Sequence, residues 1–163
     1  MKIKTSEYYN KALSSLYRNN IESFEKSIQK MNNVNETDND KRTLAFHAVI
    51  NNNANALSIL LNKNIDINKP DYNGWSLLHY AADSYYVELV KILLKSRANV
   101  NAKDNYGNNV ISRAIYSSKG REEVIKILLD AGADPSIKNE KGVSAIDLAN
   151  MISNYETKNL LIK

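Results

Sequence analysis

Residues 71–103 read DYNGWSLLHYAADSYYVELVKILLKSRANVNAK, and this stretch decides the fold. Its opening DYNG is typical of a turn. Apolar residues then recur at helical spacing in two short runs, with a break at Tyr85 and Tyr86, and the second run ends near Arg97. Each predicted helix has a single apolar stripe, so the unit needs neighbours of the same kind to bury it.

The rest of the chain repeats this unit at a nearly constant step. The landmarks are the glycines Gly74, Gly107 and Gly142, the leucine pairs at 60–61, 93–94 and 128–129, and the polar residues Asn35, Asn68, Asn101 and Ser136. Each series has steps of 33 and 35 residues. The two extra residues fall within 117–119, between two predicted helices, where a solvated loop tolerates insertion. A shared period of this length predicts a stack of helical repeats.

Three segments carry a resemblance to a known family. Residues 76–81, SLLHYA, resemble the T-P-L-H-x-A motif of ankyrin repeats. Residues 87–94 resemble the second helix of that repeat, and residues 98–101, ANVN, resemble its closing A-D-V-N. The resemblance implies an all-α ankyrin-repeat solenoid of stacked helix-turn-helix units with short hairpin tips. The expected single domain, 1–163, comprises an N-terminal cap at 1–35, repeats at 36–68, 69–101 and 102–136, and a C-terminal cap at 137–163.

Local signals predict where helices begin and end. Residues 5–30 predict two helices, capped by Ser6 and Asn20. Later helices are expected to begin at the capping residues Thr43, Ser76, Asn109 and Ser144. Glycine-like backbone is expected after the second helix of each repeat, at Asn64, Arg97 and Gly132. It is also expected between the two helices, at Asn53, Tyr85 and Gly120, with Tyr85 as the outlier.

Composition excludes several classes of protein. The 163 residues are 43% hydrophobic and 25% charged, as in a folded domain, and no apolar run approaches the ~20 residues of a membrane span. The opening MKIKTSEYYN has no apolar secretory segment, so we expect a cytoplasmic protein. Net charge is +4, but 18 acidic residues nearly match 22 basic ones without clustering, so nucleic-acid binding is not expected. We attribute the 24 asparagines to AT-rich codons rather than to a prion-like segment.

The residues offer little catalytic chemistry. No G-x-S-x-G, H-E-x-x-H, P-loop or G-x-G-x-x-G pattern occurs, and the chain has no cysteine. The ankyrin resemblance implies a structural role for His79, bonded to Ser76, rather than a role as ligand or base. His47 has no partner at metal-ligand spacing, and Asp147 replaces the motif histidine in the last unit. An enzyme, a metal site and a cofactor are therefore not expected.

The resemblance also implies a binding surface. In ankyrin repeats the hairpin tips and the first helix of each pair line a concave face where protein partners dock. Exposed aromatic side chains on such a face supply large contact area at low entropic cost. The alternative is that these aromatic rings pack on neighbouring turns. The predicted partner-binding residues are Arg42, Tyr72, Asn73, Trp75, Asp83, Tyr85, Tyr86, Asn105, Tyr106, Asn108 and Tyr116.

These features indicate a protein-protein interaction module. Residues 106–115 and 142–149 resemble small bacterial ankyrin proteins that are often encoded beside toxins. The leading hypothesis is a stand-alone inhibitor or immunity protein that neutralises a bacterial toxin or enzyme; a host-directed effector or a general scaffold is the alternative. We expect a monomer that does not bind membranes. Because the chain is basic overall, its partner surface is expected to be acidic or neutral.

Overall fold

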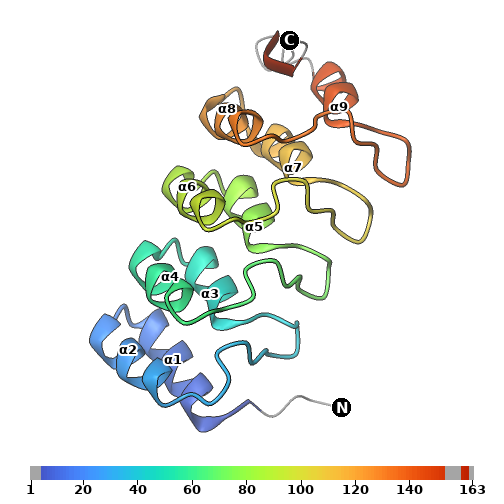
Figure 1. Ribbon diagram of the computed structural model, residues 1–163. Coiled ribbons are helices and arrows are strands. Elements are labelled where there is room, and N and C mark those ends of the chain that lie inside the picture. The colour runs from blue at the N-terminus through green and yellow to red at the C-terminus, as the bar shows by residue number, and fades with distance from the viewer. Residues whose placement is uncertain (1–4, 153–158, 162–163) are drawn as a thin grey trace.

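The chain folds as a layered stack of helix pairs, seen from the side in Figure 1. The structure is a computed structural model that describes residues 5–152 and 159–161. Within these ranges the regular structure is helical, apart from one isolated antiparallel bridge between Lys103 and Asn109. The named helices are α1 Glu7–Tyr17, α2 Ile21–Gln29, α3 Leu44–Ile50, α4 Ala54–Leu61, α5 Leu77–Asp83, α6 Val87–Lys95, α7 Val110–Ser117, α8 Glu123–Asp130 and α9 Ala145–Met151.

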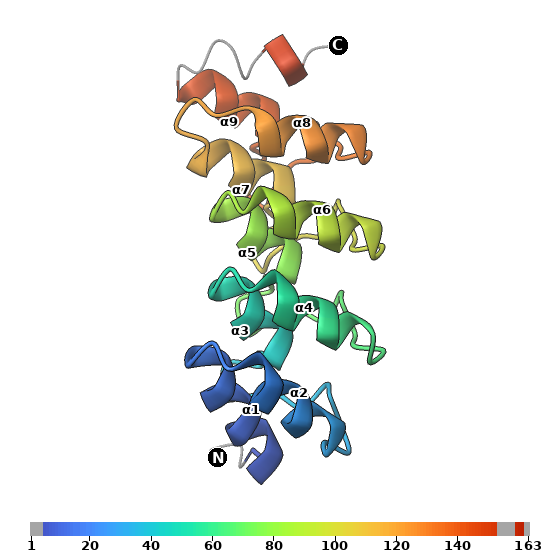
Figure 2. The ribbon, with the colours of Figure 1, turned by 90° about the vertical axis from the view of Figure 1, so that its left-hand side faces the viewer.

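The helices form two rows. An inner row consists of α1, α3, α5, α7 and α9, each packed on the next, and an outer row consists of α2, α4, α6 and α8. Figure 2 shows the two rows side by side, and in Figure 1 the hairpin loops project away from the outer row. The predicted all-α solenoid of helix-turn-helix units is confirmed. Part of the expected C-terminal cap, including Tyr155, lies outside the described residues.

A continuous apolar core runs between the rows. Each layer contributes leucine, isoleucine and valine side chains that are completely buried, at the positions that repeat along both helices of the pair. Burying one such side chain stabilises the fold by roughly 1.5–3 kcal/mol. Examples from three successive layers are Leu57 and Leu60, Leu89 and Leu93, and Val124 and Leu128. No layer closes its core alone, which explains why the sequence repeats.

Most predicted caps are present. The side chains of Ser6, Asn20, Ser76, Asn109 and Ser144 each accept a hydrogen bond from a backbone N–H in the first turn of the following helix. Thr43 is the exception, because it precedes α3 in extended conformation but makes no side-chain capping bond. The amide of Phe46 instead donates to the backbone carbonyl of Thr43, at 3.0 Å, and so is already satisfied.

Left-handed backbone occurs where the outer helices α4, α6 and α8 end. Asn64, Arg97 and Gly132 have φ of 55°, 66° and 88°, as the repeat pattern predicts. Between the helices, Tyr85 and Gly120 are left-handed as expected, but the prediction for Asn53 is wrong by one residue. Asn52 has φ of 50°, and Asn53 instead caps α4 by accepting from the amide of Ala56.

Arg97 is a position where a substitution should stabilise the protein. A non-glycine residue with left-handed backbone costs about 1–2 kcal/mol, and the Arg97 side chain is exposed. We expect Arg97→Gly to raise the free energy of unfolding by about 1 kcal/mol, measured by urea denaturation. The reciprocal change Gly132→Ala, at the equivalent position of the next layer, should lower it by a similar amount. An unchanged midpoint for both variants would contradict this reading of the backbone.

Candidate functional site

One side chain organises each hairpin tip. Asp71 accepts hydrogen bonds from the backbone amides of Asn73 and Trp75, both at 2.9 Å. Such a local bond replaces the backbone turn bond and fixes the loop. The same pattern recurs around Asp38, Asp104 and Asn139.

Consecutive tips are also bonded to one another. The amide of Tyr72 donates to the carbonyl of Asp40 in the preceding tip, and the amide of Asn105 donates to the carbonyl of Asn73. The amide of Glu140 continues the series to the carbonyl of Tyr106. These contacts measure 2.9–3.1 Å, so the tips form a continuous edge along one side of the stack.

Each tip aspartate is tied to the inner row nine residues later. The equivalent position on α3, α5 and α7 holds three different residues, and all three bond the aspartate of their own tip. The pairs are Asp38 with His47 at 2.9 Å, Asp71 with Tyr80 at 2.8 Å, and Asp104 with Arg113 at 2.6 Å. This tie holds the tips at a set angle to the inner helices and so leaves a preformed hollow between them.

That hollow is a groove of about 650 Å³ between the inner helices α3 and α5 and the first three hairpin tips. We call it the tip groove, and its lining residues are Arg42, Ile50, Asn73, Trp75, Tyr80, Asp83, Ser84 and Tyr106. Five of the predicted site residues therefore come together here. Tyr80 is not among the predicted site residues, because its position in the repeat motif is variable. Its spacing of three residues from Asp83 on one helix was the available signal, because such residues share a face.

Tyr80 links Asp71 of the second hairpin tip to Arg42 of the first. Its hydroxyl donates to Asp71 at 2.8 Å and accepts from the Arg42 guanidinium at 2.7 Å. Its ring lies edge-on to Trp75 and to Phe46, with centroids 4.9 and 5.7 Å away. Burial, followed by the neighbouring Asp71 carboxylate, raises the pKa of Tyr80 to about 12. The hydroxyl therefore stays protonated at neutral pH and keeps both bonds.

Trp75 is less exposed than predicted. It is half-buried, and its indole ring lies between Tyr80 and the Arg113 guanidinium, which is 4.5 Å from the ring centroid. A cation over an indole face is favourable by about 0.5–2 kcal/mol. One face of the Trp75 ring therefore packs on neighbouring side chains, which is the alternative to partner contact that the sequence left open. The remaining surface of Trp75 lines the tip groove.

Tyr85 must be removed from the predicted surface. Only 8% of the residue is exposed, its hydroxyl donates to the carbonyl of Arg121, and the Arg121 guanidinium lies 3.9 Å from its ring centroid. The ring reaches Arg121 in the next layer. Tyr85 therefore joins two layers, and little of its surface is accessible to a partner.

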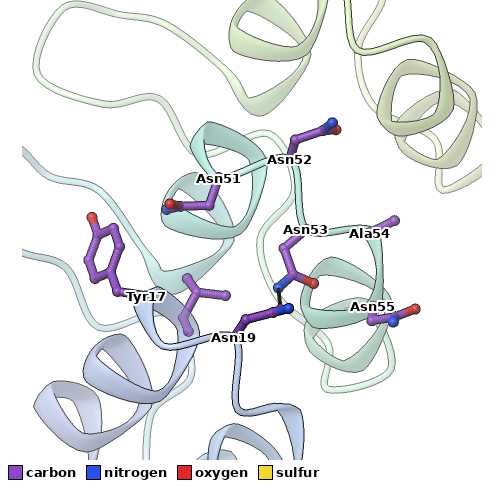
Figure 3. Close-up of a pocket in the computed structure, with 8 residues that line it drawn as sticks. Tyr17, Asn19, Asn51, Asn52, Asn53, Ala54 and Asn55 are labelled. Atoms are coloured by element: carbon purple, nitrogen blue, oxygen red, sulfur yellow. Dashed lines mark hydrogen bonds between the residues drawn. The ribbon is translucent and has the colours of Figure 1, made fainter.

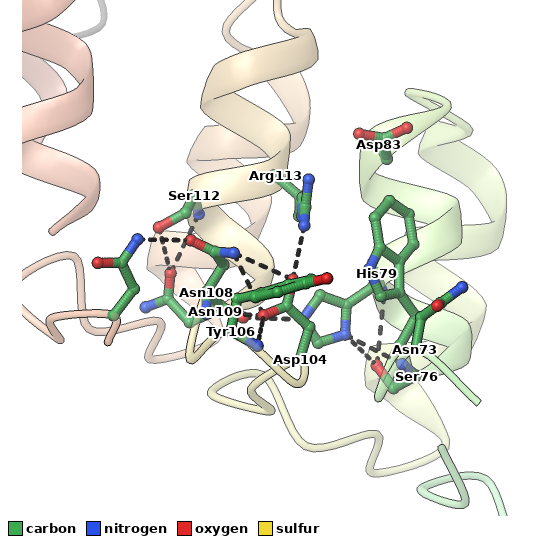
Figure 4. Close-up of polar contacts among 12 residues, drawn as sticks. Asn73, Ser76, His79, Asp83, Asp104, Tyr106, Asn108, Asn109, Ser112 and Arg113 are labelled. Atoms are coloured by element: carbon green, nitrogen blue, oxygen red, sulfur yellow. Dashed lines mark hydrogen bonds and ion pairs between the residues drawn. The ribbon is translucent and has the colours of Figure 1, made fainter. Parts of the chain in front are cut away.

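The remaining predicted residues lie outside the tip groove. Tyr72, Asn105 and Tyr116 are exposed, and Tyr86 is half-buried at the start of α6. Asn108 has a structural role, since its amide donates to Asp104 and its side-chain oxygen accepts from Asn139 at 2.7 Å. Figure 4 shows these polar contacts between the tips.

His79 has the structural role that the sequence predicts. The ring is fully buried, its Nδ1 accepts from the amide of Ser76 at 3.1 Å, and its Nε2 donates to the carbonyl of Asn108 at 3.3 Å (Figure 4). Burial lowers the pKa of His79 to about 4, so the ring is neutral and bridges two layers. In the last unit Asp147 makes the corresponding bonds to Ser144.

The comparison with protein families accounts for this architecture. A sequence model for ankyrin repeats in three copies matches residues 12–104 and 86–139, which together span well over half of the chain. The chain belongs to the ankyrin-repeat family. Ankyrin repeats are generally protein-protein interaction modules and are typically non-catalytic. No curated protein matches the chain.

The described part of this ankyrin-repeat chain holds a second, smaller hollow. It has a volume of about 420 Å³ and lies between the loop after α1 and the start of α4, as Figure 3 shows. Its lining is dominated by the neutral amides of Asn19, Asn51, Asn52, Asn53 and Asn55, and Asn53 donates to Asn19 at 3.2 Å. Without charged or aromatic walls apart from Tyr17, it is a weaker candidate for a binding site than the tip groove.

Among residues 5–152 and 159–161, no group of three or more His, Asp or Glu side chains is arranged to hold a metal ion. None of the helices found there is long and apolar enough to cross a bilayer.

Proposed function

We propose that this ankyrin-repeat chain binds one protein partner through the tip groove and thereby inhibits it, as a stand-alone immunity protein for a bacterial toxin or enzyme. The observation that carries the proposal is a preformed groove whose rim displays Tyr106, a tyrosine that is 66% exposed. An exposed aromatic ring beside a concave surface is the residue type that dominates interface energetics. The proposed role is non-catalytic, cytoplasmic and monomeric before the partner binds.

The rigidity of the groove supports this proposal. Because the first three tips are bonded to their neighbours and to their own inner helices, ordering the binding surface requires little further loss of entropy. Tyr72 and Tyr116 extend the exposed aromatic surface beyond the groove, at 68% exposure each. An inhibitor that must hold one target tightly benefits from such preorganisation.

The experiment is co-expression with the products of the genes that neighbour its own. We expect one of them to copurify with the chain and to lose its toxicity or activity when the chain is present. A complex that forms without loss of activity would instead identify the alternative, a scaffold or a host-directed effector. No complex and no protection would contradict the proposal.

Tyr106→Ala is the sharpest variant for this experiment. Its side chain is mostly exposed, so the free energy of unfolding should change little, whereas partner affinity should fall by about 2 kcal/mol, or roughly thirtyfold. Isothermal titration calorimetry would measure the change. The matched control is Lys95→Ala, an exposed residue in the last turn of α6 on the outer row. Equal affinity losses in both variants would mean that the groove is not the contact surface.

A further inference from the structure

We infer that Asp83 and Tyr106 form a subsite for a cationic side chain, lysine or arginine, of the protein partner. The inference rests on the proposed function and specifies the partner chemistry at the same groove. Asp83 is the last residue of α5 and Tyr106 lies in the third hairpin tip, and both line the tip groove. Figure 4 labels both residues; Tyr106 lies beside the polar network of the tips, and Asp83 lies apart from that network at the end of α5.

The arginines around the groove are paired with carboxylates of the chain, whereas Asp83, which lines the groove, is not paired with a cation among the described residues. Arg42 lies 3.5 Å from Asp71 and 3.6 Å from Asp40, and Arg113 is bonded to Asp104. Both cations of this region are therefore committed to carboxylates of the chain. Among the ion pairs of residues 5–152 and 159–161, none includes Asp83.

Within the described part of the chain, Asp83 has one side-chain hydrogen bond. One carboxylate oxygen accepts from the Ser117 hydroxyl at 2.8 Å, which holds the group in place between α5 and α7. The residue is half-buried, where a carboxylate interacts more strongly with a cation than it would in open solvent. A negative charge at the end of a helix is also locally unfavourable, since the final carbonyl groups are partly negative. An incoming ammonium or guanidinium group pairs with this carboxylate and offsets its unfavourable interaction with the helix end.

The Tyr106 ring supplies the aromatic part of the subsite. The Arg113 guanidinium already covers one face of Trp75, whereas the Tyr106 ring is exposed and carries no cation in the described structure. Because Tyr106 lines the same groove as Asp83, its exposed ring is available for a cation–π contact with a cation bound in the groove. The aliphatic part of a lysine or arginine side chain also matches Ile50, the aliphatic residue of the lining.

The unpaired charge of Asp83 changes the charge that we expect on the partner's contact surface. The expectation of an acidic or neutral partner used the net charge of +4 for the whole chain. Binding depends on the charges at the contact surface, and in the tip groove the unbalanced charge is negative. We therefore expect a basic anchor side chain at the centre of the contact.

The test uses small probes, because they require no knowledge of the partner. N-acetyl-lysine and N-acetyl-arginine methylamides are compared with the neutral citrulline and the anionic glutamate analogues, by fluorescence of Trp75, the single tryptophan, and by NMR shifts. We expect saturable binding of the two cationic probes only, with shifts at Asp83, Ser84 and Tyr106. Asp83→Asn keeps an acceptor for Ser117 and should weaken probe binding about tenfold.

The matched control is Asp130→Asn, the same change at an exposed carboxylate that ends α8 in the outer row. It should leave probe binding unchanged. Equal binding of the glutamate probe, or full binding by Asp83→Asn, would overturn the inference. With the intact partner, a loss in Tyr106→Ala but none in Asp83→Asn would overturn the cationic subsite and leave the proposed function standing. No loss in either variant would overturn the use of the groove itself.

Discussion

Gly74→Ala is expected to lower the free energy of unfolding by about 3–5 kcal/mol, the largest effect expected for an alanine at any of the five glycines. Gly74 has φ of 78°, and a Cβ there would stand 2.5 Å from the backbone nitrogen of Asn105 in the next tip. That nitrogen donates to the carbonyl of Asn73, so relief of the clash would break the bond between the tips. Urea denaturation followed by circular dichroism measures the loss.

Gly142→Ala is the matched control. Gly142 occupies the equivalent position of the last tip, with φ of 72°, but an added Cβ has no neighbouring atom within 4 Å among the described residues. Only the backbone strain remains, and the expected loss is about 1 kcal/mol. Similar losses in the two variants would show that the close approach of successive tips contributes nothing to stability.

Lowering the pH should destabilise the protein through His79. Its pKa falls from 6.5 to about 4 on folding, so between these values the unfolded state binds a proton that the folded state does not. Stability is therefore complete above pH 6.5 and is lost as the pH falls toward 4, by about 3 kcal/mol in all. The free energy of unfolding, measured by urea denaturation at several pH values, gives the slope.

His79→Gln supplies the control, because glutamine does not titrate. Burial also lowers the pKa of His47, so some slope of the same sign should remain in the variant. The difference between the two pH profiles isolates His79. A wild-type profile that is flat between pH 6.5 and 4, or one that the substitution leaves unchanged, would contradict a buried neutral ring.

The fold was largely predictable because its determinants are local. The repeat step, most of the capping residues and the left-handed residues Asn64 and Arg97 each follow from a few neighbouring positions, and the structure has them as expected. The error at Asn53 has the same origin. Asn52 and Asn53 both tolerate turn geometry, so residue type alone did not indicate which one is left-handed and which one caps α4.

The site was predicted only in part because its side chains depend on distant partners. The Arg113 side chain covers part of the Trp75 ring, and the Arg121 side chain covers part of the Tyr85 ring. Each arginine lies in the layer that follows its aromatic partner. Both aromatic residues were expected on the surface, and both find a guanidinium group more than 30 positions away. Tyr80 was missed for the opposite reason, since its variable place in the motif carries no sign of the bonds to Asp71 and Arg42.

Site-specific photo-crosslinking in cells tests most directly whether the tip groove is the partner-binding surface. A benzoylphenylalanine residue would replace Tyr106 in the groove or, in a second strain, the exposed Lys95 on the outer row. The account predicts that irradiation joins the position of Tyr106 to a single protein, that the position of Lys95 gives no adduct, and that Asp83→Asn reduces the yield. An adduct at the position of Lys95, with none at the position of Tyr106, would contradict it.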